Sequence, residues 1–225
     1  MPVPSPLALT LPTPTNLVFS NGFEGQVLSP GPTGWNDYHL DPGNRLVVTA
    51  YRVREGTRAL GVYCLPGGGA SKAEVQRTGL HVGQGQVTRL EWSLYVDGDP
   101  GFGPFFLADL EDTSYSLSPG VRVFAQTDDS LAVELKGYGA RLEQPYGSRV
   151  PLPTRQWVDL AWTFLPDASA GWVTLEQNGV VVLDGALRTL PSVGDQVLDR
   201  LGVGCTANSG PRAVTMFVDR VQLFQ

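Results

Sequence analysis

The chain has 225 residues, 42% of them hydrophobic, and a formal net charge of −6. This length suits one all-β domain or two small ones, and the hydrophobic content is enough for a substantial core. The negative charge argues against a nucleic-acid surface, which needs clustered basic side chains, and no apolar run is long enough to span a membrane. We therefore expect neither nucleic acid nor a membrane as a partner.

Residues 1–16 form an arm with proline at positions 2, 4, 6, 12 and 14. Proline at this spacing favours an extended, polyproline-like backbone and prevents a helix. The arm has no basic n-region, and proline interrupts each apolar run before it reaches the length of a signal peptide. We therefore expect synthesis in a cytoplasm, without export by a signal peptide.

From Leu17 to the C-terminus, alternating segments and turn signals follow one another, with no stretch of helical period. Asn178-Gly179 is a strong hairpin signal, because a type I′ turn needs positive φ at both central positions. The expected strands are 18–24, 45–51, 58–64, 72–77, 87–96, 104–110, 121–126, 130–136, 156–164, 171–176, 179–184, 197–206 and 213–224. Residues 17–225 are therefore predicted to form an all-β domain, a two-sheet antiparallel β-sandwich (jelly roll).

Alternation within the strands separates a core face from an outer face. In residues 87–96 the predicted core face carries Leu90, Trp92, Leu94 and Val96, and the outer face carries Arg89, Glu91, Ser93 and Tyr95. Two other strands show the same pattern, with core faces that consist of Val158, Leu160, Trp162, Phe164, Leu131, Val133 and Leu135. Trp35, in a loop rich in glycine and proline, is the tryptophan that we expect as a surface contact.

The two cysteines, Cys64 and Cys205, can pair only if the fold brings them together. In a reducing compartment the expected state is two buried free thiols. The sequence leaves the alternative, a disulfide, open.

Seven short motifs occur in a recognisable order along the chain. They are GFEG (22–25), REGTRALGV (54–62), KAEV (72–75), LEWSLYV (90–96), RQWVDLAWTF (155–164), GWVTLEQNGVVV (171–182) and VTMFVDRVQLF (214–224). Together they resemble the concanavalin A-like lectin/glucanase superfamily, in particular its polysaccharide-lyase-like and laminin-G-like branches. The resemblance covers roughly residues 18–225 and implies a jelly roll. That superfamily includes lectins, lyases, hydrolases and non-catalytic parts of viruses and adhesins.

For a lyase, the resemblance implies an Arg-x-Glu pair, a Gln-x-His element on a neighbouring strand and a tyrosine near the cleaved bond. A cation or amide neutralises the uronate carboxylate, a Tyr or His removes the C5 proton, and an acid protonates the leaving oxygen. Here the first element is Lys72-Ala73-Glu74, and the second falls near residues 105–112, which contain no histidine. The Glu-x-Asp-x-x-Glu spacing of the hydrolase branch does not occur. We therefore expect a non-catalytic module; a polysaccharide lyase or glycoside hydrolase with a divergent site is the alternative.

The candidate ligand-binding side chains lie on outer strand faces. Lys72 and Glu74, with Gln76, fit either a polar groove or an ordinary solvated strand face. A second set fits either a glycan-binding concavity, in which aromatic rings stack on sugars, or cross-strand ion pairs. This second set consists of Arg89, Glu91, Tyr95, Glu134 and Lys136.

Glu24 and Asp219 are the candidate metal ligands. In related carbohydrate-binding sandwiches an acid near the first strand and one on the last strand share a structural calcium ion, and the resemblance implies the same here. Calcium takes about six to eight oxygen ligands, so two carboxylates need help from the backbone. The alternative is that Glu24 only caps a turn. No other cofactor is expected, and His39 is expected to be an exposed residue rather than a ligand.

The arm raises the question of a partner. Leu7, Leu9 and Leu11 alternate, so an extended arm places three apolar side chains on one side. We expect LALTL (residues 7–11) to lie against a neighbouring subunit and to anchor the domain to a large assembly. The expected assembly is a bacteriophage virion, with this chain as a head-decoration or tail/fibre component on its surface. A glycan is the second expected partner.

Overall fold

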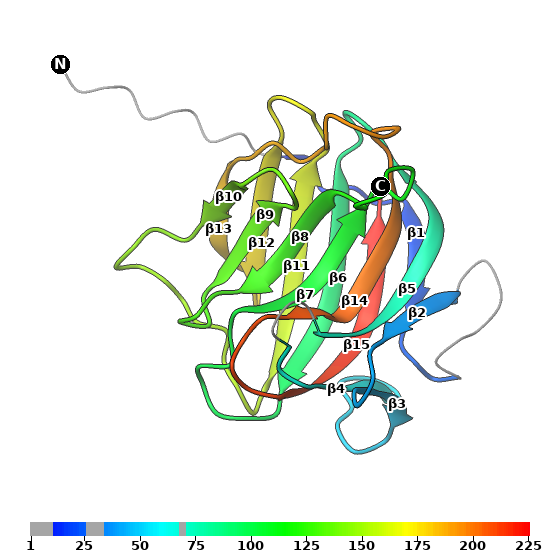
Figure 1. Cartoon of the computed structure of the whole chain (residues 1–225), viewed down its shortest axis with the longest axis vertical. Coiled ribbons are helices and arrows are strands. Elements are labelled where there is room, and N and C mark those ends of the chain that lie inside the picture. The colour runs from blue at the N-terminus through cyan, green and yellow to red at the C-terminus, as the bar shows by residue number, and fades with distance from the viewer. Residues whose placement is uncertain (1–10, 26–33, 68–70) are drawn as a thin grey trace.

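The computed structural model describes residues 11–25, 34–67 and 71–225, and every element in these ranges is a β-strand (Figure 1). The strands form two antiparallel sheets, which confirms the predicted fold class. Sheet A has the order β13-β12-β11-β6-β15-β4-β3, with β1 beside β15, and sheet B has the order β10-β9-β8-β7-β14-β5-β2. No helix long and apolar enough to cross a membrane occurs in this described part.

The strands of sheet A are β1 (Leu17–Asn21), β3 (Arg45–Thr49), β4 (Ala59–Cys64), β6 (Thr88–Val96), β11 (Trp157–Leu165), β12 (Trp172–Gln177), β13 (Val180–Ala186) and β15 (Val214–Phe224). Those of sheet B are β2 (Asp37–Leu40), β5 (Ser71–Val82), β7 (Phe105–Glu111), β8 (Gly120–Ala125), β9 (Leu131–Leu135), β10 (Ala140–Glu143) and β14 (Leu198–Asn208). The last two strands of the chain, orange β14 and red β15 in Figure 1, each lie inside a sheet between strands from much earlier in the sequence.

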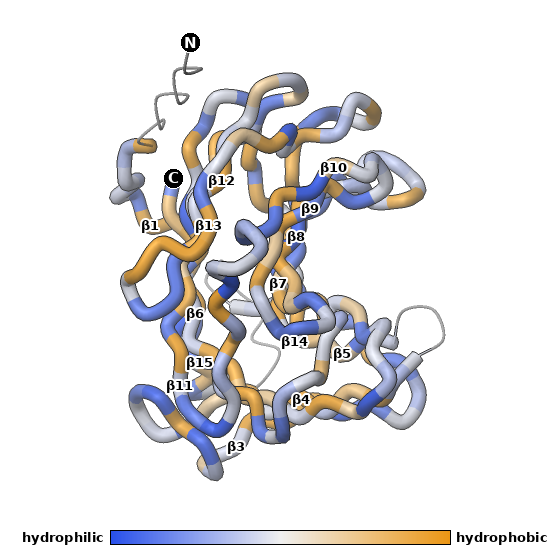
Figure 2. The backbone as a smooth tube through the Cα atoms, turned by 90° about the vertical axis from the view of Figure 1, so that its left-hand side faces the viewer, coloured by the Kyte–Doolittle hydropathy of each residue, from blue (hydrophilic) through white to orange (hydrophobic). Residues whose placement is uncertain are grey.

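The two sheets lie as two layers with the core between them (Figure 2). Leu90, Trp92 and Leu94 of β6 are at most 2% exposed, as their alternation predicted. Val158, Leu160 and Trp162 of β11, the next strand of sheet A, are buried in the same way. Each such side chain contributes roughly 1.5–3 kcal/mol by leaving water. The other face of each sheet is therefore free to carry polar side chains.

The predicted hairpin at Asn178-Gly179 joins β12 to β13, and both turn residues have positive φ, 52° and 76°. Two strands, β2 and β10, lie in segments for which no strand was predicted, between 18–24 and 45–51 and between 130–136 and 156–164. Both are four residues long and lie at the edges of sheet B, where one face and one side stay open. They therefore lack the apolar alternation that marks the other strands. His39 of β2 is exposed and lies 3.1 Å from Asp41.

The prediction that Trp35 is a surface contact is wrong. Its side chain is fully buried, stacked on Phe23 at 5.9 Å between ring centroids and edge-on to Phe19 at 4.9 Å. The loop that precedes β2 thus supplies a core residue that covers the inner face of β1. Glycine and proline around a tryptophan indicate a loop, but they do not indicate where its side chain points.

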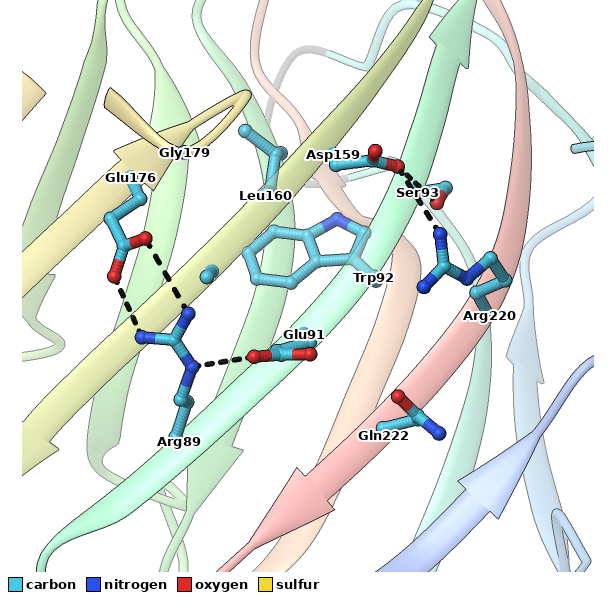
Figure 3. Close-up of a pocket in the computed structure, with 11 residues that line it drawn as sticks. Arg89, Glu91, Trp92, Ser93, Asp159, Leu160, Glu176, Gly179, Arg220 and Gln222 are labelled. Atoms are coloured by element: carbon cyan, nitrogen blue, oxygen red, sulfur yellow. Dashed lines mark hydrogen bonds and ion pairs between the residues drawn. The ribbon is translucent and has the colours of Figure 1, made fainter. Parts of the chain in front are cut away.

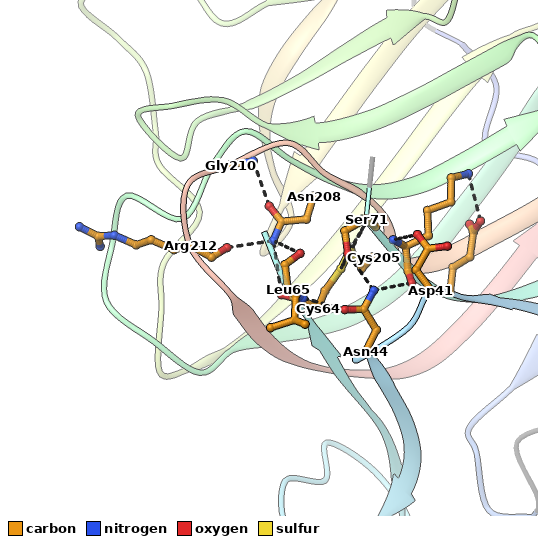
Figure 4. Close-up of a disulfide and its surroundings, with 11 residues drawn as sticks. Asp41, Asn44, Cys64, Leu65, Ser71, Cys205, Asn208, Gly210 and Arg212 are labelled. Carbon is orange, nitrogen blue, oxygen red and sulfur yellow. Dashed lines mark hydrogen bonds and ion pairs between the residues drawn. A yellow bond between two sulfur atoms is a disulfide. The ribbon is translucent and has the colours of Figure 1, made fainter. Parts of the chain in front are cut away.

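The prediction of two free thiols is also wrong, because Cys64 and Cys205 form a disulfide (Figure 4). Cys64 ends β4 of sheet A and Cys205 lies on β14 of sheet B, with 6.4 Å between the Cα atoms. The bond therefore ties the two sheets together across the core. Beside it, Asn208 Nδ2 donates hydrogen bonds to the carbonyl oxygens of Cys64 and Leu65 at 3.3 and 3.1 Å.

The arm joins the sandwich next to the C-terminus. Asn16 and Gln225 exchange two backbone hydrogen bonds of 3.1 and 2.9 Å, and Leu17 of β1 then pairs with Phe224 of β15. Residues 1–10, with most of the LALTL segment, lie outside the described residues. The contact predicted for that segment stays a prediction.

Candidate functional site

The first predicted set of ligand-binding residues lies on β5, in sheet B. Ala73 and Val75 of this strand point into the core, so Lys72, Glu74 and Gln76 point to the open face. Lys72 Nζ lies 3.4 Å from Glu74 Oε1, and Gln76 Nε2 donates to the same oxygen at 3.1 Å. The structure thus brings this set together, with Glu74 only 2% exposed at its centre.

Glu74 reaches over the neighbouring strand β14. Gly202 of β14 pairs with Gln76 on one side and with Asp109 of β7 on the other. A Cβ atom at position 202 would collide with the Glu74 carboxylate, which therefore occupies the space left by the glycine. Burial raises the pKa of Glu74 to about 7. The ammonium group of Lys72 acts to lower this pKa, whereas the nearby carboxylates of Asp109 and Glu111 act to raise it further. Near neutral pH this carboxyl group exists in both protonation states.

Two further carboxylates lie on β7. Glu111 accepts hydrogen bonds from Lys136 Nζ at 2.5 Å and from Arg200 of β14 at 2.5 and 3.0 Å. Burial acts to raise the pKa of Glu111, but the two positive charges outweigh it and the pKa is lowered. Asp109 accepts from the Thr206 hydroxyl at 2.7 Å, and burial raises its pKa. The middle of this face therefore holds one carboxyl group with a lowered pKa, Glu111, beside two whose pKa values are raised, Glu74 and Asp109.

The end of the face over β8, β9 and β10 is built from arginines on aromatic rings. Glu134 of β9 accepts from Arg122 at 2.6 and 2.8 Å and from Arg141 at 2.8 and 3.2 Å. The Arg122 guanidinium lies 3.8 Å from the centre of the Phe106 ring, and that of Arg141 lies 4.8 Å from the centre of the Phe124 ring. This end offers flat guanidinium surface, which the buried rings of Phe106 and Phe124 support from below.

The open face of sheet B differs from the pattern that the resemblance implies for a lyase. The strand beside β14 has Asp109 and Glu111 where a Gln-x-His element was expected, and β7 and β14 contain neither histidine nor tyrosine. The basic groups of the centre, Lys72, Lys136 and Arg200, each contact a carboxylate within 3.4 Å. Among the described residues, the basic side chains at the centre of this face are therefore all held by carboxylates. At the edge of the sheet, His39 of β2 lies in register with Glu74 and 3.1 Å from Asp41.

The second predicted set is not one site. Glu134 and Lys136 lie at β9, on the open face of sheet B, whereas Arg89, Glu91 and Tyr95 lie on β6 of sheet A. The two open faces lie on opposite sides of the sandwich, so the predicted grouping is wrong. Alternation shows which side chains share a face of one strand, but it does not show which strands share a sheet.

On sheet A, Arg89 is held by carboxylates from two strands (Figure 3). It donates to Glu91 at 2.6 Å, to Glu176 of β12 at 2.7 Å and to the Thr163 hydroxyl at 2.9 Å. A shallow hollow of about 180 Å³ lies between this cluster and Asp159. Arg89 and Glu91 therefore behave as the cross-strand ion pairs that were the alternative for this set.

Tyr95 lies farther along β6, between two other aromatic rings. Its ring centroid is 5.8 Å from that of Trp157 and 6.1 Å from that of Phe217, and it is 7% exposed. The structure thus separates Tyr95 from the charged cluster around Arg89 and makes it part of an aromatic row.

The candidate calcium ligands face one hollow of about 350 Å³. Glu24 accepts from the backbone N–H groups of Thr57 and Arg58 and from the Thr57 hydroxyl, so it does cap that turn. Asp219 is fully buried and accepts three backbone N–H groups; burial raises its pKa. Among the described residues neither carboxylate forms an ion pair, and no group of three or more His, Cys, Asp or Glu side chains has the arrangement of a metal site. Arg220 also lines this hollow, and it is paired with Glu55 rather than with either candidate ligand. Two acids at one hollow fit a bound calcium ion only with backbone oxygens as further ligands.

Sequence reasoning missed four polar residues of sheet B as site residues. These are Asp109, Glu111, Arg122 and Arg200, which link the β5 set to the β9 set. The available signal was the alternation Asp109-x-Glu111 within an otherwise apolar strand, FFLADLE. Charged residues at every second position of an otherwise apolar strand indicate that one face of the strand is polar, and such a face is a candidate for a functional site.

No family model and no curated protein matches this chain. Solved structures do match in fold. The endo-β-1,4-glucuronan lyase of the fungus Trichoderma reesei has a TM-score of 0.69 at 15% identity, covering 93% of this chain and 96% of its own. The cellulose-induced protein Cip1 has a TM-score of 0.67 at 16% identity, covering 91% and 95%.

A third structural match comes from a virus. The carbohydrate esterase vb_24B_21 of the Shiga toxin-encoding bacteriophage phi24B has a TM-score of 0.59 at 14% identity, covering 93% of this chain and 99% of its own. At these identities the likeness concerns the fold. The chain thus has the concanavalin A-like jelly-roll fold that the order of its motifs predicted.

Proposed function

We propose that this protein binds a polysaccharide along the open face of sheet B and does not cleave it. The observation that carries the proposal is the belt of buried and half-buried charged side chains on β5, β14, β7 and β8 and at β9, most of them in ion pairs with one another. These side chains are Lys72, Glu74, Asp109, Glu111, Arg122, Glu134, Lys136 and Arg200.

Such a belt is costly to maintain for stability alone. Glu74, Asp109 and Glu111 are at most 3% exposed, and removing carboxylates from water is repaid only in part by their partners. Apolar side chains would serve the fold at least as well. A face of alternating donors and acceptors, with the Arg122 guanidinium stacked at one end, suits the hydroxyl groups and ring faces of a sugar chain. The glucuronan lyase and the phage esterase, which share the fold, act on carbohydrates by their names.

The pairing of the central charges supports the proposal that no cleavage occurs. An elimination needs a group that neutralises the uronate carboxylate and a free base. Lys136 and Arg200 are both committed to Glu111, and β7 and β14 supply no histidine or tyrosine.

Affinity gel electrophoresis with a panel of polysaccharides tests both parts. The panel contains polyglucuronate, alginate, polygalacturonate, arabinan and a soluble cellulose derivative, and the ultraviolet absorbance of unsaturated uronate is followed in parallel. We expect retardation by at least one member with no rise in absorbance. Lys72→Gln with Arg141→Gln should reduce the retardation at least fivefold, whereas Arg155→Gln, an exposed control, should not. Equal migration in every gel would contradict the proposal.

A lyase with a divergent site is the second candidate, and one observation favours it. The pKa of Glu74, raised by burial to about 7, gives a carboxyl group that can donate or accept a proton at neutral pH. If unsaturated product forms and Glu74→Gln abolishes it, this candidate replaces the first.

We also propose a structural calcium ion at Glu24 and Asp219. The ion would neutralise the buried Asp219 carboxylate and would tie Glu24, which follows β1, to Asp219 of β15. Excess calcium should raise the melting temperature by several degrees, and Asp219→Asn should remove this response. Equal melting curves in calcium and in a chelator would contradict it.

For the setting, we infer attachment to a large assembly, such as a virion, through the arm. The support is the sequence of residues 1–16: proline limits the entropy lost on docking, and the alternating leucines provide an apolar side. Deleting residues 1–14 keeps the Asn16–Gln225 pair, so the sandwich should melt at nearly the same temperature while incorporation is lost. Normal incorporation of the truncated chain would contradict this inference.

A further inference from the structure

We propose a second ligand site, on the open face of sheet A, for a sugar ring that carries a carboxylate. The site lies over β3, β4 and β15, on the opposite side of the sandwich from the belt on sheet B (Figure 1). It does not depend on the function proposed for sheet B.

The site is the end of a row of side chains that runs across five strands. Trp157 pairs in register with Tyr95, Tyr95 with Phe217, Phe217 with Gly61, and Gly61 with Val47. Neighbouring residues across a sheet point the same way, so three aromatic rings lead to a position that has no side chain. Such a row gives a continuous apolar strip on a face that is otherwise polar.

The glycine leaves a hollow beside the last ring. A Cβ atom at Gly61 would lie 3.1 Å from Val47 Cγ1 and 3.4 Å from Phe217 Cε1, so any larger side chain would occupy the space between them. The hollow measures about 420 Å³, and Tyr63, Phe217 and Val47 line it. This volume is within the range of small-molecule sites, about 300–1,000 Å³.

Two arginines of this face, one at the hollow and one at the aromatic row, have no acidic partner. Arg45 lines it and lies 6.0 Å from the centre of the Tyr63 ring. Arg52 lies between the rings of Tyr51 and Tyr95, at 4.6 and 4.9 Å, and its Nε is buried without a hydrogen-bond partner. Within the described residues, neither forms an ion pair. The charged cluster along the same sheet, by contrast, is fully paired, as at Arg89.

Aromatic rings together with arginines that lack an acidic partner indicate the chemical class of the ligand. A purely apolar ligand would leave both guanidinium groups without a partner, and a neutral sugar would use the rings but not the charges. A pyranose ring with a carboxylate uses both, because its C–H face packs on an aromatic ring while its carboxylate takes the paired N–H donors of arginine.

The test is an NMR titration of the full chain, labelled with ¹⁵N, because it resolves this face from sheet B. The probes are cellotriose and cellotriose oxidised at C6 to the triglucuronate, which differ only in their carboxylates. We expect the triglucuronate to shift the amide signals of Val47, Gly61 and Thr215 with a Kd of about 1 mM or tighter, and cellotriose to bind at least tenfold more weakly. Arg45→Gln with Arg52→Gln should weaken binding at least tenfold, while Arg58→Gln, an exposed control, should not.

Gly61→Val fills the hollow and should abolish these shifts. If that variant does not fold, Val47→Phe, which fills the hollow from its exposed rim, serves in its place. Equal affinity for cellotriose and its oxidised form would overturn the proposal, because the arginines would then have no role. Equal shifts with a triglutamate peptide would also overturn it, since the site would then recognise charge without a sugar ring.

Discussion

The open faces of the two sheets accommodate their charged side chains in different ways. On sheet B, buried charges are paired with each other, as Glu111 is with Lys136 and Arg200. On sheet A, the end over β3 and β4 keeps Arg45 and Arg52 among aromatic rings with no acid. Breaking a buried charge pair leaves an uncompensated charge in the protein, whereas a partly exposed cation without an acidic partner costs little to lose.

The largest expected effect concerns the disulfide that joins the two sheets. The disulfide between β4 and β14 closes a loop with a sequence separation of 141 residues. Because it limits the unfolded chain, Cys64→Ala with Cys205→Ala should lower the free energy of unfolding by about 4 kcal/mol. Urea denaturation measures this, and a loss below about 1 kcal/mol would contradict it.

The next prediction separates the two faces. Arg200→Met together with Lys136→Met leaves the Glu111 carboxylate buried without a partner, so unfolding should become easier by about 3–4 kcal/mol. Arg45→Gln together with Arg52→Gln should change stability by less than about 0.5 kcal/mol. Chemical denaturation of the two double variants checks the difference. Similar losses in both would remove the distinction between the faces.

The third prediction concerns pH. Burial raises the pKa of Glu74 from 4.5 to about 7, so its protonated form stabilises the fold below pH 4.5 and this contribution is lost as the pH rises through 7. A rise of this size corresponds to about 3 kcal/mol. In Glu74→Gln this loss is absent, because glutamine does not ionise. The free energy of unfolding of the variant minus that of the unmodified chain should therefore rise by about 2–3 kcal/mol between about pH 5 and about pH 8.

Asp128→Asn is the control for this measurement. The Ser130 hydroxyl, with the Arg149 guanidinium, lowers the pKa of Asp128 to about 2. The stabilisation from Asp128 is therefore lost only as the pH falls below about 4, and the difference between this variant and the unmodified chain should stay constant over the same range. Denaturation curves at four pH values decide; a Glu74→Gln difference that does not change with pH would contradict the buried state of Glu74.

The smallest effect contrasts two glycines. A methyl group at Gly202 collides with the buried Glu74 carboxylate, whereas one at Gly61 meets side-chain atoms of Val47, Phe217 and Thr49 at 3.1 Å or more. Gly202→Ala should cost about 1–2 kcal/mol, and Gly61→Ala should cost less than about 1 kcal/mol. Melting temperatures of the two variants provide the comparison, and the reverse order would contradict it.

The strands that form the core were predictable, and the composition of the site was only partly so. Alternation in β6 separated Leu90 and Trp92 from Arg89 and Glu91, because a half-buried strand shows its two faces in its sequence. The edge strands β2 and β10 lack that pattern and were missed.

The remaining contacts of the candidate site depend on the order of the strands within the sheets. β14 enters sheet B between β5 and β7, which brings Gly202 under Glu74 and Arg200 to Glu111. These pairings join segments that are far apart in the sequence, and no local signal encodes them. The same holds for the cysteine pair. The alternation Asp109-x-Glu111 in β7 was the one local indication of a polar face on sheet B.

A crystal structure of the protein with bound oligosaccharide tests the central claim most directly. The ligand would be a hexasaccharide of whichever polysaccharide retards the protein most. We predict an intact chain that lies over β5, β14, β7 and β8, within hydrogen-bond distance of Lys72 and Arg122. A sugar chain bound only elsewhere on the sandwich, or one cleaved to an unsaturated product on this face, would contradict the account.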